Sequence, residues 1–290
     1  MDKHQRADFD SLVPAPPHDR RSFIVGSLSA GFALAVQPVS AQTISTDSNG
    51  LVAGEVKIPT STGDIPGYRA MPAGDGPFPT VLVVQAISGV EEYIRDVCRR
   101  LAKEGYFAVA PELFVRQGDP SKVTEVATIM TDIVSKVSDA QVMGDFDATT
   151  AWAKTTGKAD TGKLGIVGFC WGGRIVWLYA AHNPGLKAAV AFYGHLVGAS
   201  SEMKPKNPID IARDLKAPVL GLYGGADPGI PVDTVNKMRD AMRANKKSGD
   251  LVVYPDAGHA FHADYRPTYR KEAAQDAWQR TLSWFKVYLS

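Results

Sequence analysis

The sequence predicts an α/β protein with a mostly parallel, doubly wound sheet, helices on both faces and no large cap domain. From Pro79 onward, short β-branched apolar runs recur along the chain, and stretches with helical spacing separate them. Near-continuous apolar strands are typical of a parallel sheet that helices cover on both faces. One of these strands also leads directly into a glycine-rich turn that opens a helix, which is typical of nucleophile-bearing α/β enzymes.

The predicted elements alternate along the chain. Strand segments at 54–58 and 65–70 form a hairpin, and further strands follow at 80–84, 106–110, 164–169, 188–193, 218–223 and 251–254. Helices are expected at 91–104, at 172–181, at 231–244 and at 271–289, with one or two more between 121 and 154. Gly105 follows the first of these helices as a C-terminal cap. No internal repeat or linker is evident, so residues 42–290 are expected to form one domain.

Residues 1–41 have the pattern of an export signal. The pair Arg20-Arg21 precedes Phe23 and a weakly apolar stretch to Val36, and small residues lead to Ala41. A basic region, a short apolar region and a small-residue exit define such signals, and paired arginines favour the twin-arginine route. The apolar stretch is too short to span a bilayer. We therefore expect cleavage after Ala41 and a periplasmic or secreted mature protein.

Composition excludes some classes of function. The chain has 290 residues, 44% of them hydrophobic, and a formal net charge of +1. A nearly neutral chain offers no electrostatic footprint for nucleic acid or for an anionic membrane surface. The oligomeric state is not readable from these features.

The strand at 164–169 ends in the sequence Gly168-Phe-Cys-Trp-Gly-Gly173. This is a G-x-C-x-G elbow, with cysteine where serine is usual, and it predicts that Cys170 is a nucleophile. A sharp turn of this kind needs neighbours without side chains, because strand and helix approach closely there. The backbone N–H of Trp171, at the helix N-terminus, is then placed to bind a developing oxyanion.

A thiol needs a base and an orienting acid to react at neutral pH. In the α/β-hydrolase arrangement these follow the nucleophile in the order acid, then base, on loops after later strands. Asp227 follows the strand at 218–223, and His259 follows the strand at 251–254. The expected triad is therefore Cys170, Asp227 and His259. The second oxyanion donor is expected in the loop after the first core strand, at the backbone N–H of Ile87.

Two other interpretations are weaker. His259 and His262, with Asp256 and Asp264 nearby, lack the i, i+4 helical spacing of zinc-binding histidines, so no metal is expected. Cys98 and Cys170 are the only cysteines. A disulfide between them would consume the nucleophile, and Cys98 lies in a helical pattern well removed from the elbow.

These features together resemble the dienelactone hydrolase family, the carboxymethylenebutenolidases. Besides the elbow, the resemblance is carried by the segments 85–89, 93–96, 104–114, 193–194, 225–227, 257–261, 266–267 and 277–281. It implies hydrolysis of a small ester or enol-lactone through an acyl-thiol intermediate, without a cofactor. It also supports the triad and the two oxyanion donors.

The chain departs from the family pattern in two places. Members commonly carry a glutamate, which contacts the resting thiol, at the position of Ala86. An arginine for a substrate carboxylate is expected where Ala263 stands. Arg174, Arg116 and His262 are the candidates to replace that arginine as substrate-binding residues. Without the glutamate, Cys170 is expected to rest either as an ion pair with His259 or as a thiol that only His259 activates.

The sequence therefore predicts a cofactor-free hydrolase of small esters or lactones. A broader carboxylesterase or thioesterase with the same triad is the alternative within enzymes. A catalytically decayed, exported binding protein is the alternative outside them, because a fold does not fix a function.

Overall fold

The computed structural model describes residues 43–290, so the predicted export signal at residues 1–41 lies outside the described residues. One eight-stranded sheet runs through this part of the chain, in the order β1-β2-β4-β3-β5-β6-β7-β8. β1 (Leu51–Thr60) and β2 (Gly63–Pro72) form the predicted hairpin, which pairs in antiparallel register from Leu51–Pro72 to Thr60–Gly63. β2 pairs antiparallel with β4, and every later pairing is parallel.

The predicted alternation of strands and helices is confirmed. The parallel strands are β3 (Phe78–Val84), β4 (Phe107–Pro111), β5 (Ala159–Phe169), β6 (Leu186–Phe192), β7 (Val219–Gly224) and β8 (Gly249–Tyr254). The long helices are α3 (Glu92–Lys103), α5 (Asp139–Thr155), α6 (Trp171–His182), α7 (Val232–Ala244) and α8 (Lys271–Tyr288). The short elements are α4 (Val126–Thr128), a π-helical turn at Ile129–Ile133, and 3₁₀ turns at Pro120–Lys122, Val134–Lys136 and Pro208–Asp214.

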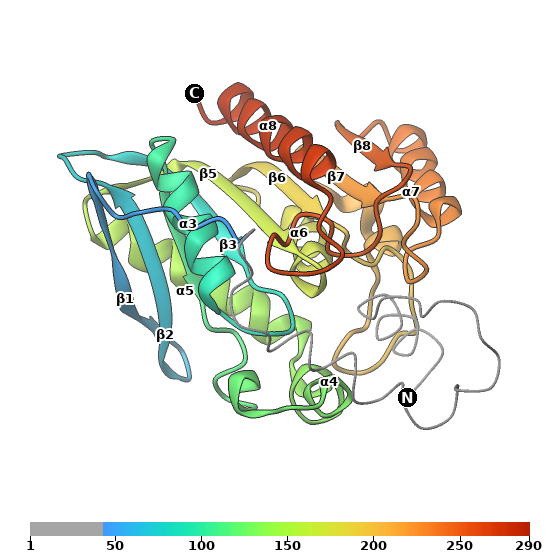
Figure 1. The fold of residues 1–290 in the computed structure, drawn as a ribbon, viewed down its shortest axis with the longest axis horizontal. Coiled ribbons are helices and arrows are strands. Elements are labelled where there is room, and N and C mark those ends of the chain that lie inside the picture. Colours follow the sequence, from blue (N-terminus) through green and yellow to red (C-terminus); the bar gives the residue numbers. More distant parts are fainter. Residues whose placement is uncertain (1–42) are drawn as a thin grey trace.

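Helices cover both faces of the sheet. Figure 1 shows α3 and α8 on the face toward the viewer and α5 and α6 behind the sheet. α3 packs on β2 and β4, whereas α5 and α6 pack on β5 and on each other. The central strands are accordingly apolar on both sides, and Val81, Leu82, Val83 and Val84 of β3 are all fully buried. Burial of such side chains stabilises the core through the hydrophobic effect.

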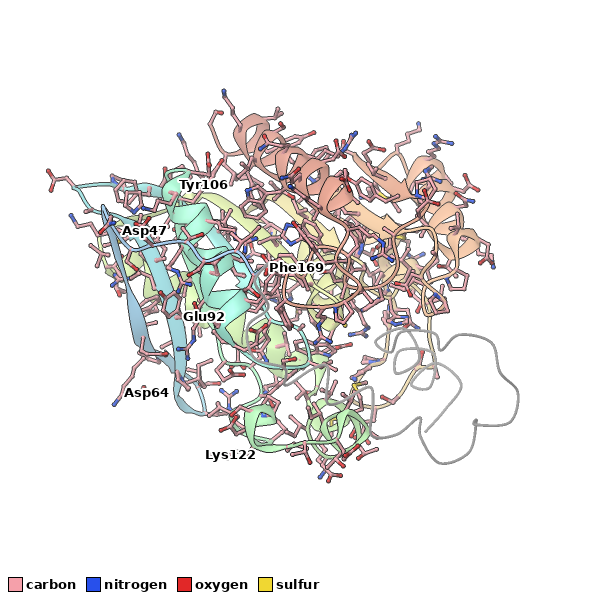
Figure 2. The ribbon with its side chains drawn as sticks, viewed as in Figure 1. Asp47, Asp64, Glu92, Tyr106, Lys122 and Phe169 are labelled. Atoms are coloured by element: carbon pink, nitrogen blue, oxygen red, sulfur yellow. The ribbon has the colours of Figure 1, made fainter. Side chains whose placement is uncertain are left out.

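The carboxyl ends of the parallel strands meet at one edge of the sheet. Phe169, the last residue of β5, is labelled near the centre of the molecule in Figure 2. In open α/β sheets ligands bind at this edge, because the loops that leave the strands converge there. Among residues 43–290, no helix is both long enough and apolar enough to cross a membrane.

Candidate active site

The elbow after β5 holds Cys170 in a strained conformation. Its backbone has φ 56° and ψ −117°, in the region that side-chain-bearing residues rarely adopt. The surrounding glycines are required by contact: a Cβ on Gly168 would lie 2.5 Å from the carbonyl oxygen of Gly172, and one on Gly172 would lie 2.5 Å from that of Gln85. The crossing of β5, α6 and the loop after β3 is therefore possible only without side chains, and it presents Cys170 above the sheet.

His259 and Asp227 lie together as the sequence predicts. His259 Nδ1 is 2.7 Å from Asp227 Oδ2, and both side chains are almost fully buried. The other carboxylate oxygen, Asp227 Oδ1, accepts a hydrogen bond of 2.9 Å from the backbone N–H of Gly229. That second bond fixes the carboxylate plane, so Asp227 orients the imidazole ring.

His259 also interacts electrostatically with Cys170. Burial lowers the pKa of His259, but electrostatic and hydrogen-bond interactions with Cys170 and Asp227 outweigh burial and raise the pKa well above the usual value. Burial also raises the pKa of Asp227, yet the charge and hydrogen bond of His259 hold it below the ordinary range. The imidazole of His259 therefore binds a proton more readily than usual, and it interacts with the Cys170 side chain.

The two predicted oxyanion donors belong to two different segments beside this thiol. Trp171 is the first residue of α6, where a helix leaves its N–H groups without intrahelical acceptors. Ile87 lines the same cavity as Cys170. The loop that carries Ile87 is held by Glu112, whose Oε2 accepts 2.8 Å from the backbone N–H of Val90. The fold thus brings Ile87 and Trp171 to Cys170 from two segments.

Cys170 opens into a narrow cavity of about 20 Å³. That volume holds a single water molecule or the reacting end of a small acyl group. Most of its walls are apolar or aromatic, and one arginine is present. The lining residues are Ala86, Ile87, Tyr93, Phe169, Cys170, Tyr193, Ala260, Ala263, Tyr265 and Arg266.

None of the three predicted substrate-binding side chains lines this cavity. Arg174 makes a bidentate ion pair with Asp139, at 2.7 and 2.9 Å. Arg116 pairs in the same way with the buried Asp145, at 2.8 and 2.9 Å. Both guanidinium groups pair with carboxylates that compensate their charge. They therefore stabilise the fold outside the cavity of Cys170.

His262 is also placed elsewhere. Its Nδ1 lies 2.6 Å from the hydroxyl of Tyr93, and its ring stacks on Phe169. Burial, with a smaller effect from Arg100, lowers the pKa of His262 to about 3. A neutral, buried ring with this partner supports the cavity wall and cannot balance a substrate anion.

Sequence reasoning missed Arg266. A turn in which Arg266 N–H donates to Ala263 C=O at 2.9 Å brings this residue back beside Ala263, where an arginine was expected. Its Nε donates to the hydroxyl of Tyr265 at 3.2 Å, and its guanidinium lies 5.1 Å from the centre of that ring. Among the described residues, no side chain or carbonyl accepts from its terminal nitrogens. Arg266 therefore offers free donors to the cavity.

The remaining site predictions concern cysteines and metals. Cys98 is buried and unpaired, and Cys170 is likewise a free thiol, so the two form no disulfide with each other. Burial raises the pKa of the Cys98 thiol far above its usual range. Within residues 43–290, no group of three or more His, Cys, Asp or Glu side chains is arranged to hold a metal ion.

A parallel sheet with a nucleophile elbow, followed by an acid and then a histidine on later loops, defines an α/β-hydrolase. The chain belongs to the dienelactone hydrolase family, whose model matches residues 65–289. It is accordingly a hydrolase of carboxylic esters or lactones.

Individual relatives agree with this assignment. A Methylorubrum extorquens protein, provisionally named carboxymethylenebutenolidase, is 66% identical over 283 residues, which is 97% of each chain. A Klebsiella pneumoniae crystal structure, provisionally named dienelactone hydrolase, is 57% identical with a TM-score of 0.81, covering 82% of this chain and 99% of that one. A Bradyrhizobium protein named as a probable 2-oxo-3-(5-oxofuran-2-ylidene)propanoate lactonase is 35% identical over 77% of this chain and 89% of its own length.

Proposed function

We propose that this enzyme hydrolyses a small ester or enol-lactone through a Cys170–His259–Asp227 triad and an acyl-cysteine intermediate. The observation that carries the proposal is the buried His259 ring, which is held by Asp227 at 2.7 Å and interacts with Cys170 on its other side. Acyl transfer requires a nucleophile, a base that interacts with it and an acid that orients the base.

The chemistry follows in two steps. The Cys170 sulfur attacks the carbonyl carbon, and the N–H groups of Ile87 and Trp171 bind the oxyanion. The tetrahedral intermediate then expels the alkoxide or enolate, which receives a proton from His259. In the second step His259 takes a proton from water, the hydroxide attacks the thioester, and Cys170 leaves with the acid product released.

The resting state is expected to be a Cys170 thiolate paired with protonated His259. Ala86 places a methyl group in the cavity. An acid at this position, beside the sulfur, would favour the neutral thiol, and the methyl group has no such effect. The raised pKa of His259 supports the same pairing. The pH dependence of iodoacetamide alkylation tests it: a single titration near the ordinary thiol value of about 8.5 would contradict the ion pair. Ala86→Glu is expected to shift that profile toward higher pH.

The substrate is expected to carry a carboxylate. Arg266 lines the cavity, and a planar guanidinium suits a carboxylate. The lactone in the name of the Bradyrhizobium relative is a propanoate, which has such a group. A broader carboxylesterase or thioesterase would not depend on this arginine, so Arg266→Met separates the two. That variant should lose anionic substrates and retain neutral ones.

We also propose that the mature protein acts outside the cytoplasm. The paired Arg20-Arg21, the weakly apolar stretch and the small residues before position 41 support export by the twin-arginine route. Expression of the full chain fused to a reporter that is active only after export would test this. Replacing the arginine pair by two lysines should then abolish the signal.

Hydrolysis of p-nitrophenyl acetate tests the nucleophile. Wild type should release p-nitrophenol, Cys170→Ala should not, and Cys98→Ala is the matched control that keeps activity. Equal release by wild type and Cys170→Ala would show that the nucleophile is assigned wrongly. No release by wild type, together with tight binding of a lactone, would favour the decayed binding protein.

A further inference from the structure

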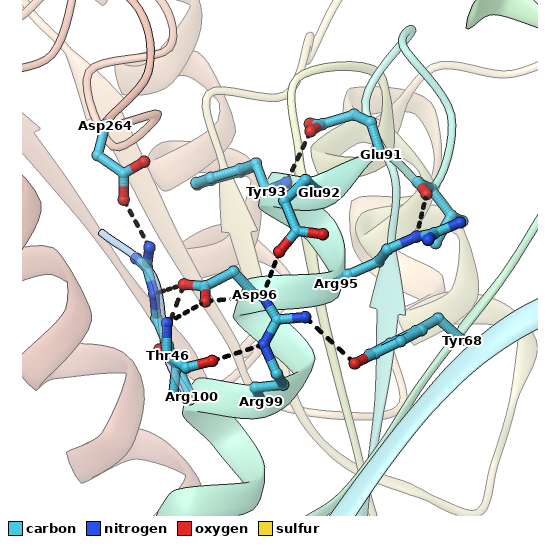
Figure 3. A network of polar contacts seen from close by, with 11 residues as sticks. Thr46, Tyr68, Glu91, Glu92, Tyr93, Arg95, Asp96, Arg99, Arg100 and Asp264 are labelled. Atoms are coloured by element: carbon cyan, nitrogen blue, oxygen red, sulfur yellow. Dashed lines mark hydrogen bonds and ion pairs between the residues drawn. The ribbon is translucent and has the colours of Figure 1, made fainter. Parts of the chain in front are cut away.

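The carboxylate of Glu91 is linked through Tyr265 to Arg266, the arginine of the cavity. Glu91 precedes α3, and Figure 3 shows it at the start of that helix, with its carboxylate directed at the backbone of Tyr93. Its Oε2 accepts 2.7 Å from the Tyr93 N–H, and its Oε1 accepts 3.4 Å from the Tyr265 hydroxyl. The same hydroxyl accepts from Arg266 Nε. The Tyr265 hydroxyl therefore joins the acid that caps α3 to the arginine of the cavity.

Arg266 interacts with charges on two sides. Burial lowers the pKa of its guanidinium, but Tyr265, Glu91 and Cys170 outweigh burial and raise it. The arginine thus remains a cation beside Cys170, and Glu91 is the carboxylate that acts on its charge. A substrate carboxylate at Arg266 would therefore interact with the same positive charge as Glu91, and the two anions would repel each other.

Glu91 is poised to change its charge near neutral pH. Burial raises its pKa to about 7, against the opposing effects of the Tyr93 N–H, Arg266 and Tyr265. Glu92, on its own helix, raises it further. Arg266 and Tyr265 are the ionisable groups that act on Glu91 from the segment before α8, and Cys170 shares the cavity with Arg266 and acts on its charge.

We propose that Glu91 is a specificity-determining residue, which competes with the carboxylate of the substrate for Arg266 and so couples binding of anionic substrates to uptake of a proton by Glu91. The inference rests on the proposed function, since it takes the cavity of Cys170 as the substrate site. It assigns Glu91 no contact with the reacting atoms.

The sign of the effect follows from linkage. Below pH 7 Glu91 is neutral, so Arg266 is fully available to an anion. Above pH 7 Glu91 is ionised, so an anionic substrate must displace its interaction or bind together with a proton. If the anionic substrate binds only to enzyme in which Glu91 is neutral, the fraction of enzyme able to bind it falls about tenfold between pH 6 and pH 8. A neutral substrate has no such dependence.

A purely structural role for Glu91 makes a different prediction. Glu91 also caps α3 through the Tyr93 N–H, and loss of a cap lowers stability. Glu91→Gln keeps an oxygen for that bond and removes only the charge. A cap-only residue would therefore leave the ratio of anionic to neutral substrate turnover unchanged at every pH.

Two matched esters provide the test: 4-carboxyphenyl acetate and its neutral analogue 4-carbamoylphenyl acetate. Both give the same acetyl-cysteine, so the ratio of their kcat/KM values cancels the titration of Cys170 and His259. In wild type this ratio should fall up to tenfold from pH 6 to pH 8. In Glu91→Gln it should stay near its low-pH value throughout. Glu92→Gln, the adjacent exposed acid, is the control that keeps the fall.

A flat ratio in wild type, or a fall that persists in Glu91→Gln, would overturn the inference. If wild type hydrolyses neither ester, the proposed function fails instead, and the coupling is then measured by binding. Calorimetry of 4-hydroxybenzoate with Cys170→Ala, in two buffers of different ionisation enthalpy at pH 7.5, counts the protons taken up. Uptake that disappears on adding Glu91→Gln supports the coupling. Absence of binding, or binding without uptake, refutes it.

Discussion

Replacing Asp227 by asparagine tests how the base is oriented. The backbone N–H of Gly229, 2.9 Å from Oδ1, would retain the amide oxygen of the new side chain, so its NH₂ group would face His259. Two donors would then oppose each other across the 2.7 Å contact. His259 can relieve this only by keeping its single proton on Nε2, and that nitrogen then cannot take a proton from the water that hydrolyses the acyl-cysteine.

The magnitude follows from burial. A hydrogen bond to a charged group contributes roughly 1.5–3 kcal/mol, and a buried donor left without a partner costs a further 1–3 kcal/mol or so. A loss of about 4 kcal/mol in transition-state stabilisation corresponds to about a thousandfold lower kcat/KM. The assay is p-nitrophenyl acetate hydrolysis at pH 7.5, with thermal unfolding to establish that the variant is folded.

Asp256→Asn is the matched control, because Asp256 is an exposed carboxylate in the loop that carries His259. It should change kcat/KM less than twofold. A folded Asp227→Asn variant with less than a tenfold loss would refute the orienting role of Asp227.

Three further predictions concern stability and the residues around the site. Arg116→Met leaves the buried carboxylate of Asp145 unpaired, so the free energy of unfolding in urea should fall by about 3–5 kcal/mol while kcat/KM of the folded enzyme stays unchanged. A selective loss of activity on anionic substrates would instead show that Arg116 binds them. Gly194→Ala places a Cβ 2.2 Å from the carbonyl carbon of Gly173, so the free energy of unfolding should fall by about 3 kcal/mol or more. A melting temperature equal to that of wild type would contradict this contact. The pKa of the half-buried Glu91 is raised from 4.5 to about 7, so its contribution to stability is full below pH 4.5 and is lost as pH rises through 7. Glu91→Gln should therefore recover up to about 3 kcal/mol at pH 9 in urea unfolding, and the absence of a gain would contradict the raised pKa.

The parts of the site that the sequence predicts are those determined by local patterns. An apolar β-branched run marks β5, and the glycines after it mark the elbow because no side chain fits there. Asp227 and His259 follow recognisable strands, and parallel strands bring their carboxyl ends together whatever the sequence between them. The order of these residues in the chain is therefore enough to predict that they lie together.

The charged residues around the substrate were not predictable in this way. Nothing in the sequence shows that Arg116 and Arg174 have anionic partners. The packing of α5 brings Asp145 to Arg116 and Asp139 to Arg174. Arg266 lies three residues beyond the expected position, and a turn that no strong sequence signal marks returns it to the cavity. Whether a charge is available to a ligand depends on long-range partners, and these are decided by tertiary structure.

The balance of charge in the cavity connects Ala86 with Arg266. If the resting pair forms, His259 and Arg266 carry two positive charges, and Cys170, Asp227 and ionised Glu91 carry three negative ones. A substrate carboxylate adds a fourth negative charge, and protonation of Glu91 returns the number to three. An ionised acid at position 86 would add one more negative charge in a site where charges interact strongly. An alanine at that position is therefore what this arrangement requires when the substrate itself is an anion and the nucleophile is a thiolate.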